Sequence, residues 1–170
     1  MSSKRLQPGD RVSHPVYGFG VIEGVTTFDQ GGRTTDFYNV RLSQASVLTV
    51  PVDRAEALGL RRIVNGLATI VPWLRAPAHA LPDNDRARVV DLKASWLAPQ
   101  PAALAHAVRD LMGRSHTHRL TPNDKRWLTE ACERMSAEAA LVDAIELFQA
   151  RAAIQHEIEL LKSAVAWISG

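Results

Sequence analysis

Cysteine is nearly absent from this sequence, because Cys132 is the only one among 170 residues. A single cysteine excludes an internal disulfide and every multi-cysteine zinc or iron–sulfur site, and it favours a reducing compartment. Long hydrophobic runs are missing too. No segment approaches the roughly 18 apolar residues of a membrane span, and residues 1–6 lack the apolar run of a secretion signal. We therefore expect a soluble, unprocessed, cytoplasmic protein with no membrane partner.

The familiar catalytic motifs are also missing: there is no Gly-Lys-Ser/Thr phosphate loop, no Gly-x-Ser-x-Gly and no Gly-x-Gly-x-x-Gly. His116 and His118 flank Thr117, but no further ligand stands nearby at the spacing of a metal site, and two solvated loop histidines fit the pattern better. Cys132 falls on the apolar stripe of a predicted helix, without an identifiable base to activate it. We therefore predict a protein that is not an enzyme and binds neither cofactor nor metal.

The net charge is only +2, but positive charge is concentrated in the middle of the chain. Lys and Arg against Asp and Glu number seven to six in residues 1–61, ten to five in 62–128, and three to seven in 129–170. A local basic excess attracts a polyanion such as DNA, because neutralised phosphates release their counterions. An ordinary solvated surface would account for the same counts, so charge alone leaves both interpretations open.

Residues 11–52 alternate between apolar and polar positions and are punctuated by glycine, as short half-buried strands are. Three segments are strand candidates: Phe19–Val25, Thr35–Leu42 and Val47–Val50. Gln30–Arg33 contains two glycines and predicts a hairpin turn, since glycine tolerates positive φ. Residues 1–60 are therefore predicted to form a small antiparallel β-barrel of SH3 or Tudor type.

The segment Val47, Leu48, Thr49 and Val50 carries no charge and is followed by Pro51. At the edge of a sheet such a strand presents unpaired N–H and C=O groups, to which a partner protein can add a strand. In the interior of the sheet the same segment would simply be core. The sequence does not distinguish these two places.

After Val52 glycine thins out and helical spacing replaces alternation. Residues 61–170 are predicted to form an all-α helical bundle, so strands and helices are segregated and the fold class is α+β. The first two expected helices are one around Ile63–Val71 ended by Pro72, and one capped by Asp83 with Val89, Leu92, Lys93 and Trp96 inside. The next runs from Pro101 to about Gly113 with Leu104, Val108, Leu111 and Met112 inside. A fourth begins at Thr121-Pro122, and the last is marked by Ile154, Ile158, Leu161, Val165 and Ile168.

All four tryptophans lie in this helical part. Trp96 and Trp167 have apolar helical neighbours and are interpreted as core. Trp127 follows Lys125-Arg126 in the first turns of its helix, so a place in the core and a contact with DNA are both open for it.

Several motifs follow one another along the chain in a recognisable order. The β part contains Gly9-Asp10, His14-Pro15 and Gly18-Phe19-Gly20 near its start, and Val50-Pro51-Val52 with Gly59-Leu60-Arg61 near its end. The helical part contains Leu74-Arg75-Ala76-Pro77, Val108-Arg109-Asp110-Leu111 and Leu120-Thr121 with Lys125-Arg126. In this order the motifs resemble the opening, the end of the first domain and the helical signatures of the CarD/CdnL family of bacterial transcription regulators. The first domain alone is shared with transcription-repair coupling factors, but helicase motifs are absent from this sequence.

The resemblance implies a Tudor-like first domain that binds the β subunit of RNA polymerase, at its β1 lobe, through the edge strand Val47–Val50. It also implies a monomer, associated with the nucleoid through polymerase, whose helical domain contacts promoter DNA at the upstream edge of the −10 element and stabilises the open complex. The DNA-facing candidates in the helical part are Arg86, Arg88, Arg109, Arg114, Arg119, Lys125, Arg126 and Trp127. For Arg109, a buried ion pair is the alternative to a contact with DNA.

At Asp85 the sequence departs from the family, which commonly carries there a tryptophan that wedges into the minor groove. An acid at this position is repelled by phosphates. The alternatives are a weaker or non-wedging DNA contact, substitution by Trp127, a different alignment of this loop, or a polymerase-binding adaptor without a direct DNA wedge. An RNA-binding barrel and an unknown hydrolase have less support, because the β part has nearly balanced charge and most of its aromatic residues are needed for its core.

Overall fold

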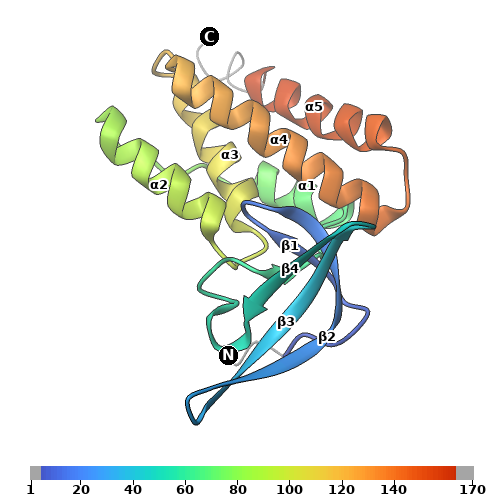
Figure 1. Cartoon of the computed structure of the whole chain (residues 1–170). Helices are drawn as coiled ribbons and strands as arrows, with labels where there is room; N and C mark the ends of the chain where they lie inside the picture. Colours follow the sequence, from blue (N-terminus) through green and yellow to red (C-terminus); the bar gives the residue numbers. More distant parts are fainter. Residues whose placement is uncertain (1–4, 164–170) are drawn as a thin grey trace. The chain divides into compact units, whose positions relative to one another are not determined.

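The computed structural model describes residues 5–163 (Figure 1), and the chain divides into two compact units, Met1–Ile63 and Val64–Gly170. The division falls after Ile63 and not at Leu60, because Arg61–Arg62 (β5) pair with Arg11–His14 (β1) and so belong to the sheet of the first unit. Among the helices of residues 5–163, none has the length and apolar character needed to cross a lipid bilayer.

The first unit is a five-stranded antiparallel sheet in the order β4-β3-β2-β1-β5. Its longer strands are β2 (Gly18–Gln30), β3 (Arg33–Ser43) and β4 (Ser46–Pro51), which contain the three predicted segments. Together with the helices that follow, this sheet confirms the α+β class. The predicted barrel, however, is not closed. Within the described residues β4 and β5 stand at the two ends of the strand order and do not pair with each other.

The turn between β2 and β3 is confirmed as a glycine turn, since Gly31 and Gly32 have φ angles of 65° and 85°. One face of the sheet covers the core of the unit, which is formed by Val12, Ile22, Tyr38, Val40, Val50, Ala55 and Leu60. A short 3-10 helix, Val52–Arg54 (η1), follows β4 and leads towards β5. The sheet therefore buries one face and leaves β4 at an edge.

The second unit consists of the helices α1 (Leu67–Arg75), α2 (Asp85–Leu97), α3 (Ala103–Ser115), α4 (Pro122–Asp143) and α5 (Leu147–Ser163). Side chains from α1, α3, α4 and α5 form its main core, which includes Ile70, Leu74, Val108, Met112, Met135, Ile154 and Ile158. The buried positions predicted for α3 are confirmed, as are Ile154 and Ile158 of α5, whereas Leu161 is only partly buried against the core. The predicted positions Val165, Trp167 and Ile168 lie outside the described residues.

The predicted end of the first helix is wrong, because Pro72 lies inside α1, which continues to Arg75. A proline inside a helix removes one backbone hydrogen bond, but Ile70 and Leu74 are fully buried on either side of it and hold the helix against the core. The helix ends before Pro77 instead, since the residue that precedes a proline avoids the helical conformation.

The predicted start and inner face of α2 also need correction. Asn84, and not Asp83, is the N-cap, and its side chain accepts a hydrogen bond from the backbone N–H of Ala87 at 3.1 Å. Leu92 is buried as predicted, but Arg88 is the other buried residue, whereas Val89 and Lys93 are exposed. An arginine was not expected on the inner face because its charge requires partners there, which only the folded chain provides.

The predicted start of α4 is confirmed in detail. The Thr121 hydroxyl accepts a hydrogen bond from the backbone N–H of Asp124, and the Asp124 carboxylate accepts one from the backbone N–H of Thr121. Pro122 occupies the first helical position. These contacts form a capping box, which satisfies N–H groups that have no partner within the helix.

Candidate functional site

The open edge of β4 is the first candidate site. In the described part of the sheet β4 pairs with β3 only, so the structure decides between the edge and interior places in favour of the edge. Val50 is buried in the core and Leu48 packs against it, whereas Thr49 is exposed and Val47 is 53% exposed. The strand thus has an apolar inner row and a solvent-facing outer row.

The backbone of β4 presents its free groups at known positions. The ladder with β3 pairs Pro51 with Phe37, Val50 with Tyr38, Thr49 with Asn39, Leu48 with Val40 and Val47 with Arg41. In an antiparallel ladder, residues whose N–H and C=O point to the neighbouring strand alternate with residues whose groups point away. Pro51 has no N–H to donate to β3, so it takes a position whose backbone groups point away from β3. Because the two orientations alternate, Thr49 and Val47 have the same orientation as Pro51. Their backbone groups therefore face the open edge.

Proteins commonly blunt an exposed edge with charged residues, prolines or bulges. Between Ser46 and Pro51 the strand β4 contains no charged residue. Only its two ends are protected, by Pro51 and by an irregularity of register near Ser46. The middle of β4 is therefore able to accept a strand from a partner.

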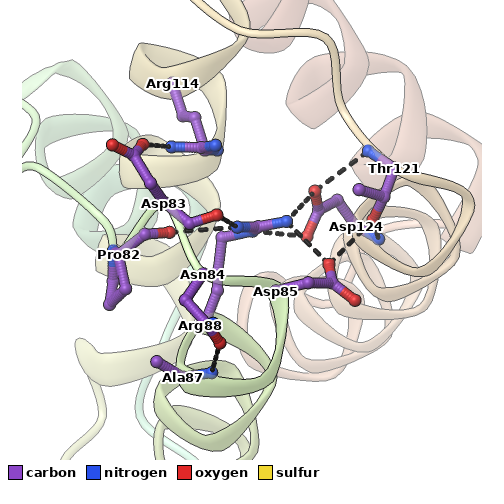
Figure 2. Close-up of polar contacts among 9 residues, drawn as sticks. All are labelled: Pro82, Asp83, Asn84, Asp85, Ala87, Arg88, Arg114, Thr121 and Asp124. Atoms are coloured by element: carbon purple, nitrogen blue, oxygen red, sulfur yellow. Dashed lines mark hydrogen bonds and ion pairs between the residues drawn. The ribbon is translucent and has the colours of Figure 1, made fainter.

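A buried polar network in the helical unit is the second feature (Figure 2). Arg88 of α2 is 1% exposed, and it donates to both carboxylate oxygens of Asp124 at 2.9 and 3.0 Å. It donates further to the carboxylate of Asp85 at 2.8 Å and to the carbonyls of Pro82 and Asp83 at 3.0 and 3.1 Å. Every one of these acceptors lies at the start of α2 or α4, so the network joins the first turns of the two helices.

The ionisation of Asp124 fits this arrangement. Burial opposes the charged form, but the hydrogen bonds from Arg88 and Thr121 outweigh it, and the pKa of Asp124 is lowered. The same pairing raises the pKa of Arg88 despite its burial. Both groups are therefore charged at neutral pH, and the pair is a buried salt bridge.

Two predicted DNA-facing residues are buried, and the structure removes them from that set. Arg88 is enclosed by the network just described. Arg109 is 4% exposed and binds the Asp110 carboxylate at 2.7 Å and Nδ1 of His79 at 2.7 Å. Neither guanidinium is available to a phosphate, because its donors are used inside the fold. For Arg109 the alternative of a buried ion pair is the one observed.

The other basic candidates lie around the joined helix starts. Arg86 stands in the first turn of α2, Lys125 and Arg126 in the first turn of α4, and Arg119 just before it; all four are exposed. The side chain of Arg114 is only 9% exposed and binds the Asp83 carboxylate at 2.8 Å. This hydrogen bond lowers the pKa of Asp83, as does the charge of nearby His118. Four of the predicted cations are therefore exposed at or near the starts of α2 and α4, whereas Arg114 is largely buried and paired.

Trp127 packs into the helical unit. It is partly buried against the core, and its ring meets that of Trp96 edge to face, with 6.2 Å between centroids. Trp96 also carries the Arg134 guanidinium over its ring at 4.9 Å. Of the two places open for Trp127, the structure shows the core. The side chain of Asp85, for which the sequence left the DNA contact open, is 51% exposed and is held by Arg88.

The metal-ligand and thiol candidates of the sequence remain to be placed. Within residues 5–163 no three His, Cys, Asp or Glu side chains lie close enough to hold a metal ion. Burial raises the pKa of the Cys132 thiol to about 11, which keeps it protonated at neutral pH. Cys132 is partly buried against the core, and a protonated thiol is a poor nucleophile.

Comparison with protein families completes this description. Residues 6–64 match the CarD-like/TRCF RID domain, and residues 70–155 match the CarD C-terminal domain. The two matches define a transcription factor of two domains that interacts with RNA polymerase. The chain belongs to the CarD/CdnL family, a family of transcription factors without enzymatic activity.

Proposed function

We propose that this protein binds the β1 lobe of the RNA polymerase β subunit by strand addition to β4. In this proposal the first unit, Met1–Ile63, acts as a Tudor-like polymerase-binding domain, and the second unit, Val64–Gly170, as the domain that reaches promoter DNA. The observation that carries the proposal is the uncharged edge of β4, on which Val47 and Thr49 turn their backbone groups outward. Added strands are held by main-chain hydrogen bonds, so such an edge supplies affinity for a partner strand.

The helical domain then contacts DNA at the upstream edge of the −10 element and stabilises the open complex. Arg86, Arg119, Lys125 and Arg126 are exposed near the joined starts of α2 and α4, and none of them has an ion-pair partner among the described residues. Exposed cations of this kind increase the affinity of a protein for DNA, because they neutralise phosphates. Asp85 offers no aromatic wedge, so we propose a contact with the phosphate backbone and not an intercalating one.

The structure also supports a second candidate, a polymerase-binding adaptor without direct DNA wedge activity. Trp127 is packed against the core, and Asp85 is tied to Arg88. Within residues 5–163, neither of these two positions therefore offers an aromatic wedge. An adaptor would bind polymerase through β4 in the same way but would leave the lifetime of the open complex unchanged.

Strand addition to β4 is tested by replacing Thr49 with proline. Because the N–H of Thr49 faces the open edge, Thr49→Pro removes one group needed by a partner strand and no hydrogen bond of the β3–β4 ladder. The matched control, Thr49→Val, keeps the N–H. We expect Thr49→Pro to lose binding to the purified polymerase β1 lobe while Thr49→Val retains it. Equal binding by both variants would refute strand addition.

The lifetime of promoter open complexes then separates the two candidates. A regulator changes this lifetime, and Thr49→Pro removes the change. An adaptor binds polymerase and leaves the lifetime unaltered.

A further inference from the structure

The chain passes from the first unit to the second between Ile63 and Val64. The backbone N–H of Ile63 donates to the carbonyl of Arg11 at 2.9 Å, next to the pairing of β1 with β5. The backbone N–H of Val64 donates instead to the carboxylate of Glu138, on α4, at 3.3 Å. Two successive residues are thus hydrogen-bonded into different units, and no residue lies between them.

Glu138 also holds the residue that follows. This side chain is 1% exposed, and the carboxylate oxygen that binds Val64 accepts a second hydrogen bond, from the backbone N–H of Asn65 at 3.3 Å. Asn65 is buried too, and its side-chain amide donates to the carbonyl of Pro101, shortly before α3, at 3.0 Å. A buried backbone N–H requires an acceptor, and α4 supplies it here. Residues 64 and 65 are therefore fastened to the helical unit from their first atoms.

The helix α1 receives its cap from the same helix α4. Its N-cap is Gly66, which has no side chain to accept a hydrogen bond. The carboxylate of Asp143 takes this role and accepts from the backbone N–H of Leu67 at 2.7 Å. An acid at this place satisfies an N–H without a partner inside the helix and is favoured by the helix dipole. A Cβ at Gly66 would collide with the Asp143 carboxylate, so glycine leaves the space that the acid occupies.

Glu138 and Asp143 together form what we call the α4 clamp, and the clamp sets the length of the connection between the units. While it is closed, the connection is the single peptide link between Ile63 and Val64. If it opened, residues 64–66 would lose these anchors and add about 10 Å of extended chain, at about 3.3 Å per residue. A longer flexible connection lowers the effective concentration of a tethered module at its binding site.

We propose that Glu138 and Asp143 are positioning residues, which keep the helical unit close to promoter DNA while the sheet is bound to polymerase. This inference rests on the proposed function, in which one unit binds polymerase and the other binds DNA. Both acids stand towards the C-terminal end of α4, whereas the candidate DNA-binding residues Lys125 and Arg126 stand at its start. The clamp therefore acts on the geometry of the connection and not through contact with either partner.

The first test lengthens the connection and leaves the clamp intact. Insertion of Gly-Ser-Gly between Ile63 and Val64 adds as many residues as an open clamp would release. We expect this full-length variant to bind the purified polymerase β1 lobe as the wild type does, and to unfold its helical unit at the same urea concentration. Its effect on the lifetime of promoter open complexes should be severalfold smaller. A clamp with a merely structural role predicts no such loss, so a wild-type effect on the lifetime would overturn the proposal.

The second test opens the clamp. Glu138→Leu removes the acceptor of two backbone N–H groups, whereas the control Glu138→Gln keeps an acceptor oxygen at the same place. Because Glu138 is buried, Asp143→Ala with its control Asp143→Asn provides a second pair on an exposed residue. We expect Glu138→Leu and Asp143→Ala to reduce the effect on the open-complex lifetime severalfold, with unchanged affinity for the β1 lobe, and the two controls to retain it. Wild-type lifetimes with both disruptive variants would overturn the proposal.

Amide hydrogen exchange of the free protein, followed by NMR, tests the clamp without polymerase. We expect the amides of Val64 and Asn65 to exchange about tenfold faster in Glu138→Leu than in Glu138→Gln, because one hydrogen bond is lost at each. Equal rates would overturn the clamp itself. A wild-type protein that neither binds the β1 lobe nor changes the open-complex lifetime would refute the proposed function. A wild-type protein that does both, with an insertion variant that matches it, would refute the positioning role alone.

Discussion

Replacement of Asp124 by asparagine is expected to destabilise the helical unit strongly. Asparagine has nearly the same shape as aspartate and retains an oxygen that accepts the hydrogen bond from the backbone N–H of Thr121. It cannot balance the charge of Arg88, whose guanidinium is buried together with the Asp124 carboxylate. The variant therefore isolates the electrostatic part of the network from its capping function.

Loss of one partner of a buried ion pair typically costs about 3–5 kcal/mol, because the remaining charge stays buried without compensation. Arg88 keeps the carboxylate of Asp85 and the carbonyls of Pro82 and Asp83. We therefore expect a loss of about 3 kcal/mol in the free energy of unfolding, at the lower end of that range. Addition of Arg88→Met to Asp124→Asn should recover part of this loss, since the double variant buries no unpaired charge.

The assay is urea unfolding of the full chain followed by tryptophan fluorescence. All four tryptophans belong to the second unit, so the signal reports on the helical unit alone. The control is Asp91→Asn, on an exposed position of α2, which should change stability by less than about 0.5 kcal/mol. A loss of under about 1 kcal/mol for Asp124→Asn would refute the argument that Arg88 depends on this carboxylate.

The dependence on pH has a defined direction. The pKa of Asp124 is lowered in the folded state, and in the unfolded chain it returns to about 4. The carboxylate therefore stabilises the fold fully above about pH 4, and this contribution disappears as the pH falls through the lowered value. Asp124→Asn should consequently show its full deficit at pH 7 and a shrinking deficit in strongly acidic solution.

Two further predictions concern the basic surface and the single thiol. Lys125→Glu combined with Arg126→Glu should weaken promoter complexes and reduce the slope of log affinity against log salt by about 0.9 for each phosphate that is no longer neutralised; an unchanged slope in filter-binding measurements would exclude these residues from DNA binding. Cys132, with a pKa of about 11, should react slowly with a disulfide reagent at pH 8 and faster as the pH approaches 11. Rapid labelling at pH 7 would show that its thiol is not buried as described.

Local features of the sequence were sufficient to predict much of the secondary structure. The glycine pair at residues 31–32 fixes a turn because few other residues tolerate its φ angles. The hydroxyl, proline and acid at positions 121, 122 and 124 fix the start of α4 because they satisfy its first N–H groups locally. At Pro72 the same kind of local rule gave a wrong prediction, the end of the first helix. Its local preference against a helix is overcome by the burial of Ile70 and Leu74, which is a tertiary effect.

The candidate sites were only partly predictable. The sequence singled out Val47–Val50 as an uncharged strand, but the pairing order of the sheet was needed to place it at an edge. It also supplied a set of cations without showing that Arg88 and Arg109 are buried and paired. Hydrophobic periodicity assigns a charged residue to the solvent, and it cannot foresee partners that lie far along the chain.

By itself, the sequence determined the α+β class, the family and the local signals that begin and end most helices and strands, because these depend on neighbouring residues and on motifs read in order. Only the tertiary structure decided that β4 lies at an open edge and that Arg88 pairs with Asp124, 36 positions further along the sequence. It also decided that the Phe28 side chain stays half-exposed on the sheet. These outcomes depend on contacts between distant segments. Their free energies arise from burial and from pairing of charges, which exist only once the chain has folded.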